Sequence, residues 1–236
     1  MDLNEGRLNL ASTLRLAPGP LQLYVQRGSA ARQIRIDPAM CASALKYIAP
    51  VLADVAAAEG RFSIELDDCR VPLADPAQGE LKGRLVIHSV EVGPGPLVRE
   101  LAILLGRAVP ARLTRESVVP FQMVNGRVYH QGLELVFPDL TIRTHGSVGL
   151  DHTLLLMAEM PVPPKWVAGN TQVASALKNQ TIRLPINGTL ERPQIDQRTL
   201  QQLSRQFVEK AAENVIKDQV KKQLDENWDK IFRPFR

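Results

Sequence analysis

The sequence is poor in aromatic residues and in cysteine. Phe, Trp and Tyr make up 5% of the 236 residues, and the cysteines are Cys41 and Cys69. Two thiols cannot supply the framework of bridges that holds small secreted domains together. We interpret them as small buried apolar residues, with a single bridge in an oxidising compartment as the alternative. The apolar mass is Leu, Val, Ile and Ala, and at 44% hydrophobic residues it suffices for one sizeable core or two small ones.

A dominant charge and a long apolar run are also missing. The 29 cationic and 25 anionic residues are interspersed, and no basic cluster with aromatic residues beside it is present, so we expect no nucleic-acid partner. No stretch reaches the roughly 18 apolar residues of a membrane span, and the first residues lack the pattern of a signal peptide. If the protein works outside the cytoplasm, we expect this chain to be a fragment whose targeting segment lies elsewhere.

Motifs that carry chemistry are absent as well. There is no phosphate-binding loop and no dinucleotide fingerprint, and Gly146-Ser147-Val148-Gly149 lacks the spacing of a nucleophile elbow. The adjacent Asp67 and Asp68 would point to opposite faces of a strand and make a poor acid/base pair. We therefore expect no enzyme, no cofactor and no metal, with a hydrolase of unrecognised site as a distant alternative. The histidines do not show three converging metal ligands; they are His88, His130, His145 and His152.

What the sequence does contain is alternation of apolar and polar residues with a period of two. This pattern is typical of strands with one buried and one wet face. It begins at Leu8 and is regular from Phe121 to Met160, where Asn125-Gly126 predicts a tight hairpin turn. Apolar steps of three and four predict helices at 38–58, where Asp37 is the cap and Pro50 a kink, at 97–105 and at 198–232.

These elements predict an α+β fold, in which a twisted, curved antiparallel sheet forms an open apolar groove. We divide the chain into a β-rich segment with two helices (1–117), a β-meander (118–196) and a long amphipathic helix (197–236). A sheet with one apolar face has to bury that face on something. If the helices cover it fully, the result is an ordinary two-layer domain; if they do not, the remaining trough suits acyl chains.

The segment Ile182-Arg-Leu-Pro-Ile-Asn-Gly-Thr-Leu-Glu-Arg-Pro-Gln-Ile-Asp196 resembles the closing strand of AsmA-like proteins in their C-terminal region. The order of strands and turns over 121–160 is similar to the terminal β-meander of that family, so the resemblance covers about residues 118–196. It implies a bacterial envelope protein with a curved β-groove that carries phospholipid between membranes. It also implies a periplasmic location and an inner-membrane anchor, in a segment that this chain lacks.

The resemblance and the alternation together predict a non-enzymatic role in outer-membrane biogenesis or intermembrane lipid transport. The partner would be a phospholipid or another acyl lipid. The alternative is a structural or interaction module that binds an envelope protein through the C-terminal helix. The groove is expected at the apolar positions of the meander, which are Val128, Leu133, Leu135, Phe137, Leu140, Ile142, Leu154, Leu156, Ile182, Leu184 and Ile186.

Overall fold

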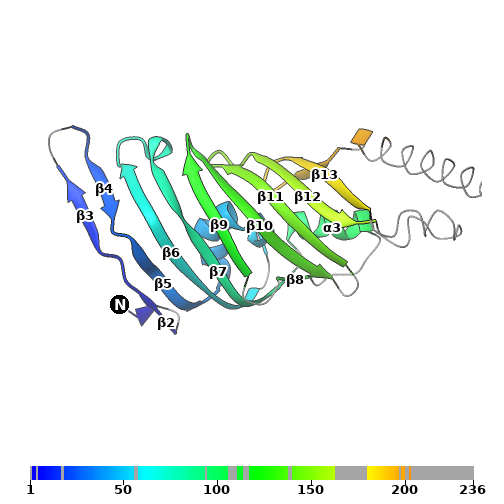
Figure 1. The fold of residues 1–236 in the computed structure, drawn as a ribbon, viewed down its shortest axis with the longest axis horizontal. Helices are drawn as coiled ribbons and strands as arrows, with labels where there is room; N and C mark the ends of the chain where they lie inside the picture. The colour runs from blue at the N-terminus through cyan, green and yellow to red at the C-terminus, as the bar shows by residue number, and fades with distance from the viewer. Residues whose placement is uncertain are drawn as a thin grey trace, which may run out of the picture. The chain divides into compact units, whose positions relative to one another are not determined.

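A computed structural model of the chain contains two compact units. Met1–Met160 and Arg183–Asp196 form the first unit, and Pro161–Ile182 and Gln197–Arg236 form the second. Nearly all described residues belong to the first unit, whose sheet is drawn in Figure 1. The structure describes residues 2–3, 5–16, 19–55, 58–93, 95–105, 111–113, 117–137, 140–162, 180–196, 198–199 and 202.

One 14-stranded sheet organises the described residues. The strands are β1 (Asp2–Leu3), β2 (Gly6–Leu8), β3 (Ser12–Arg15), β4 (Gln22–Val25), β5 (Gly28–Arg35), β6 (Ala58–Pro72), β7 (Glu80–Val92), β8 (Ala111–Leu113), β9 (Ser117–Val124), β10 (Arg127–Phe137), β11 (Leu140–Gly149), β12 (Leu154–Pro161), β13 (Thr181–Gly188) and β14 (Pro193–Ile195). Their main order in the sheet is β1-β2-β5-β6-β7-β8-β10-β11-β12-β13-β14; in addition, β4 pairs with β6, β3 pairs with β4, and β9 lies between β7 and β10. The expected boundary between residues 117 and 118 falls inside this sheet, at β9.

The hairpins follow from local sequence. Asn125 and Gly126 both have positive φ, 49° and 69°, and join Val124 to Arg127 across a two-residue turn. Backbone of this kind matches the right-handed twist of the flanking strands, so the predicted tight turn is confirmed. Burial alternates along β9 and β12 with period two, as the sequence pattern predicts for strands with one apolar face.

In the described part of the chain, helical segments are few and short. They are α1 (Pro38–Met40), the π-helical turn η1 (Cys41–Leu45), α2 (Lys46–Ile48), the 3-10 turns η2 (Pro50–Leu52) and η3 (Pro76–Gln78), and α3 (Pro96–Leu105). The Asp37 carboxylate accepts a hydrogen bond from the Met40 N–H at 2.8 Å, which makes it the expected N-cap. The helix expected at 97–105 is present as α3.

The predicted α+β class is wrong, because strands dominate and α3, with 10 residues, is the longest helix in the described part of the chain. No single helix spans 38–58. At Ala49, φ is −126° and ψ is 82°, so the helical path ends directly before Pro50, whose ring clashes with a preceding turn. Ala58 already belongs to β6. No long C-terminal helix is present among the described residues, and the one predicted at 198–232 lies outside them apart from 198–199 and 202.

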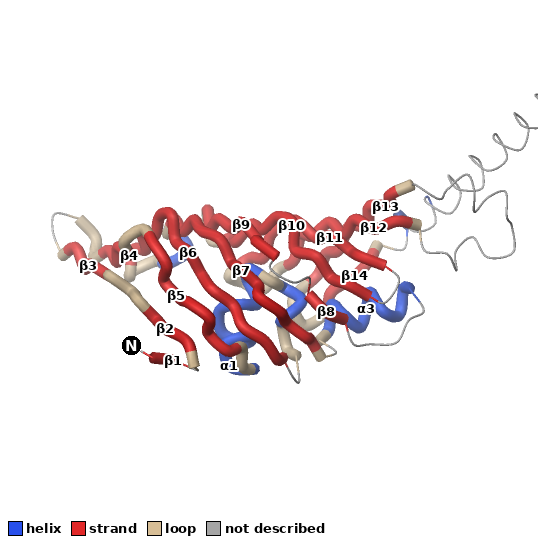
Figure 2. Tube along the Cα trace, turned by 60° about the horizontal axis from the view of Figure 1, so that its bottom comes forward, coloured by secondary structure: helices blue, strands red, loops and turns tan. Residues whose placement is uncertain are grey.

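Apart from η3, which lies in the turn between β6 and β7, the helical segments lie on one face of the sheet, over its middle and C-terminal strands (Figure 2). α2 contacts β10 and β11, and α3 contacts β14. The strand residues on that face form the core, in which Leu135, Ile142 and Leu184 have no exposed surface. In both views, no described helix covers the strands β3 and β4.

Two neighbouring leucines of β12 test which face is the core. Leu154 is 1% exposed and Leu155 is 55% exposed. We expect Leu154→Ala to lower the free energy of unfolding by about 2–5 kcal/mol, because it leaves a cavity in the packed face. Leu155→Ala, the matched control, should change it by less than about 0.5 kcal/mol. Urea denaturation followed by circular dichroism measures both, and equal effects would show that the two faces are wrongly assigned.

Candidate functional site

Cross-strand neighbours on the apolar face form a row that runs across the sheet. Residues directly opposite one another in an antiparallel ladder point to the same face. Leu14 lies opposite Leu23, and Leu23 lies opposite Val71. Cys69 shares this face because it is two residues from Val71 on β6. From Cys69 the row continues through Leu81, Met123, Val128, Val148 and Leu154, so one apolar face extends from β3 to β12.

This face is covered at one end and open at the other. At the covered end, Met123 is 7% exposed and Val148 is fully buried. At the β3 end, five leucines are between 37% and 71% exposed; they are Leu10, Leu14, Leu16, Leu21 and Leu73, and we call them the open strip. Leu21 and Leu73 are held side by side, since the Leu73 N–H donates to the Leu21 carbonyl at 2.9 Å. Single exposed leucines are ordinary, but several on one face mark a site of interaction.

The positions predicted to form the groove have the opposite character. Each is at most 5% exposed, and the set is Val128, Leu133, Leu135, Phe137, Leu140, Ile142, Leu154, Leu156, Ile182, Leu184 and Ile186. An acyl chain would reach these side chains only if the elements packed over them moved away. The structure brings them together as core, and it leaves the same apolar face accessible at β3, β4 and the end of β6.

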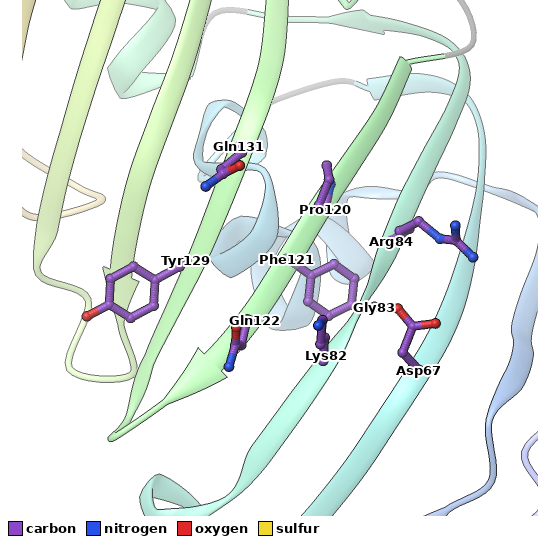
Figure 3. A pocket seen from close by; sticks show the side chains of 9 residues that line it. All are labelled: Asp67, Lys82, Gly83, Arg84, Pro120, Phe121, Gln122, Tyr129 and Gln131. Carbon is purple, nitrogen blue, oxygen red and sulfur yellow. The ribbon is translucent and has the colours of Figure 1, made fainter.

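A shallow pocket of about 310 Å³ lies on the sheet over β7, β9 and β10 (Figure 3). Its lining is Asp67, Lys82, Gly83, Arg84, Pro120, Phe121, Gln122, Tyr129 and Gln131. Lys82 lies opposite Gln122, and Gln122 lies opposite Tyr129, so these exposed side chains share the face that is opposite to the core. The lining carries charges of both signs, from Asp67, Lys82 and Arg84, and the Arg84 guanidinium is also paired with Glu65 at 2.9 Å. This arrangement offers hydrogen bonds to a polar ligand.

Lys46, His152 and Glu191 form a polar cluster that connects α2 to two turns of the sheet. The Lys46 ammonium donates to His152 Nε2 at 3.2 Å, which requires the neutral tautomer in which Nδ1–H donates to Glu191 Oε1 at 2.6 Å. His152 has a φ of 68°, in the left-handed region, and its ring lies 5.9 Å from that of Tyr47. Burial, followed by the charge of Glu191, raises the pKa of Tyr47. The cluster ties the helical cover to the sheet, and no group of three metal ligands is present in the described ranges.

Ser63 and His88 resemble a nucleophile and its base. Ser63 Oγ lies 2.9 Å from His88 Nε2, and it also accepts the backbone N–H of Gln33 at 3.0 Å. Gln33 has a φ of 52° at an irregularity in the β5–β6 ladder. Among the described residues no carboxylate is hydrogen-bonded to His88, so the orienting member of a catalytic triad is missing. The pair stabilises this irregularity of the ladder.

The covered part of the face contains one buried imidazole. His130 is 1% exposed; its Nε2 lies 3.4 Å from Thr144 Oγ1, and its Nδ1 has no hydrogen-bond partner. Burial, with a smaller effect of His145, lowers the pKa of His130 to about 4. Both cysteines are buried and unbridged, and burial, followed by the charge of Asp37, raises the pKa of Cys41 to about 11. These thiols are therefore inert apolar side chains at neutral pH.

Comparisons with protein-family models, with curated proteins and with solved structures return no match. The similarity to AsmA-like proteins stays a prediction. None of the helices in the described part of the chain has the length and apolar character needed to cross a bilayer. The sequence contains the leucines of the open strip, but no local signal separates a covered stretch of an apolar face from an uncovered one. The cluster of Lys46, His152 and Glu191 is assembled from three distant segments and has no motif.

His130 predicts a specific dependence of stability on pH. Its pKa is 6.5 when unfolded and about 4 when folded, so below pH 6.5 the unfolded chain binds a proton that the folded chain does not. Above pH 6.5 the imidazole is neutral in both the folded and the unfolded chain, so it does not make the free energy of unfolding depend on pH. Below pH 6.5 the free energy of unfolding falls as the pH drops towards 4. We expect a loss of about 2 kcal/mol between pH 7 and pH 5 from this residue, at about 1.4 kcal/mol per unit.

The loss should be absent in His130→Leu, which removes the titrating group at similar volume. His145→Gln, on the neighbouring strand, is the matched control and should retain most of it. Guanidinium denaturation at a series of pH values measures the difference between each variant and the wild type. A parallel pH profile for wild type and His130→Leu would contradict the assignment.

Proposed function

We propose that the protein binds acyl chains of phospholipid on the open strip, without catalysis. The observation that carries the proposal is the continuity of one apolar face from a buried core to five exposed leucines. Such a face is normally covered in a soluble domain. An acyl chain is a fitting cover, because it presents only methylene groups and needs no polar partner.

The energetics suit loose holding of lipid. Removing apolar surface from water contributes about 25 cal/mol per Å², which amounts to about 0.8 kcal/mol for each buried methylene. The side chains of the strip are all apolar and cannot distinguish one lipid headgroup from another, so we expect many acyl lipids to bind. Binding through apolar contact alone also permits an acyl chain to slide along the face, and guiding lipid along a sheet requires such movement.

The biological setting that we propose comes from the resemblance to AsmA-like proteins. It is the bacterial envelope, with a periplasmic location and attachment to the inner membrane, and the process is outer-membrane biogenesis or intermembrane lipid transport. The proposal moves the lipid site from the meander, where the apolar side chains are buried, to Leu10, Leu14, Leu16, Leu21 and Leu73. The alternative of partner binding by the C-terminal helix concerns residues outside the described ranges.

The test is lipid content and probe binding. Organic extraction of the purified protein followed by mass spectrometry should release phospholipid, and a fluorescent fatty acid should bind and be displaced by phospholipid. In Leu21→Gln/Leu73→Gln, each side chain loses a contact worth about 1.5 kcal/mol, so we expect the Kd of the probe to rise at least about tenfold.

Leu155→Gln is the matched control, since Leu155 is also exposed, at 55%, but lies on the opposite face of the sheet. It should leave the Kd unchanged. The midpoint of urea unfolding should be the same in all three proteins, because the substituted leucines are exposed. Absence of both extractable lipid and probe binding would rule out the proposal.

A further inference from the structure

The outer edge of β3 is available for another strand. β3 is hydrogen-bonded to β4 on one side, and the described residues place no strand on its other side, because β1 pairs along β2 only. The Gln26 N–H donates to the Ala11 carbonyl at 2.9 Å, in register with the pairing of Ser12 and Val25. In an antiparallel ladder, backbone groups alternate in direction, so those of Ser12 and Leu14 point to the open edge.

We propose that this edge pairs with β3 of a second copy of the chain, antiparallel and about a two-fold axis at Thr13. Opposed residues must share a face, and a two-fold axis meets this condition when it passes through a residue. With the axis at Thr13, Leu10 lies opposite Leu16 of the second copy, and Ser12 opposite Leu14. On the other face, Thr13 meets its own equivalent and Ala11 meets Arg15. No like charges are opposed, and a threonine pair is favourable in a ladder.

The neighbouring register is less suitable. An axis at Leu14 would place Leu10 opposite Pro18, which has no N–H to donate to the ladder. Edge strands that avoid pairing usually carry a proline or an inward-pointing charge. Residues 10–16 contain neither on the apolar face, whose members are Leu10, Ser12, Leu14 and Leu16. Residues 10–16 can therefore pair with their equivalents in a second copy without placing a proline or a charge on the apolar face.

The dimer joins the two open strips. A two-fold axis perpendicular to the sheet keeps both apolar faces on the same side, so the strips would form one trough with a helix-covered region at each outer end. Four hydrogen-bonded pairs contribute about eight backbone hydrogen bonds. An interface of this kind is smaller than the roughly 1,200 Å² of a stable complex, so association should be weak and depend on concentration. The pairing rests on the strand edge and does not require lipid.

Sedimentation velocity of the full chain, over a range of concentrations, tests the proposal. We expect a reversible monomer–dimer equilibrium. Ser12→Pro removes an outward N–H and keeps every leucine and every β3–β4 hydrogen bond, so the dissociation constant should rise at least about tenfold. Ser12→Ala retains the N–H and should associate as the wild type does. Ser12→Lys, which places a charge on the inward face of the edge, should also be monomeric.

Far-UV circular dichroism and the unfolding midpoint of each variant show whether it is folded. If one of Ser12→Pro and Ser12→Lys fails to fold, the other still tests whether the edge of β3 forms the dimer. A wild type that stays monomeric at several hundred micromolar overturns the proposal, as does a dimer that both variants leave intact. Lipid extraction from the same samples separates the two proposals. A monomer that contains lipid contradicts only the dimer, and a dimer without lipid contradicts only the lipid-binding function.

Discussion

A sheet with a single apolar face must bury that face, and the structure depends on how far the chain meets this requirement. The cross-strand row from Leu14 to Leu154 shows that the face is continuous. Short helical segments and α3 cover its middle and C-terminal strands, where they create an ordinary core. No described helix reaches β3 and β4, where leucines on the same face are exposed. The covered part of this face thus stabilises the fold, and the open part of the same face is the candidate binding site.

Polar contacts support this division of the face into a covered part and an open part. The hydrogen bonds of His152 to Lys46 and Glu191 tie α2 to the turns at the covered part of the sheet. Ser63 and His88 stabilise an irregular part of the β5–β6 ladder. His130 is a polar group enclosed in the core, and its burial lowers its pKa. The first two groups of contacts thus support the cover and the sheet, whereas His130 makes the stability depend on pH.

Much of the sheet could be predicted from the sequence. Alternation identified the strands of 121–160, Asn125-Gly126 identified a hairpin, and the steps of α3 identified a helix, because these signals are local. The segment 38–58 was predicted poorly. Its apolar steps suit a helix, yet Pro50 and the π-helical turn at Cys41–Leu45 divide it, and β6 starts at Ala58. Periodicity reports which face is apolar and does not report where a helix stops.

The position that we propose for the lipid site could not be predicted from the sequence, for a physical reason. The most regular alternation, at residues such as Leu133 and Ile142, marks the best-packed part of the face, because packing demands a large side chain at every inward position. The open strip is interrupted by Ser12, which lies between Leu10 and Leu14, and by turns, so its alternation is less regular. Whether a stretch is covered depends on helices far away in the sequence, and alternation contains no information about them.

Photo-crosslinking with a diazirine-labelled phospholipid tests directly whether the open strip binds lipid, because it reports where on the apolar face the acyl chain lies. After irradiation, proteolysis and mass spectrometry, we expect the label on peptides that contain Leu14, Leu21 or Leu73. Label concentrated on residues 128–160, or on the face that carries Tyr129 and Leu155, would contradict the account.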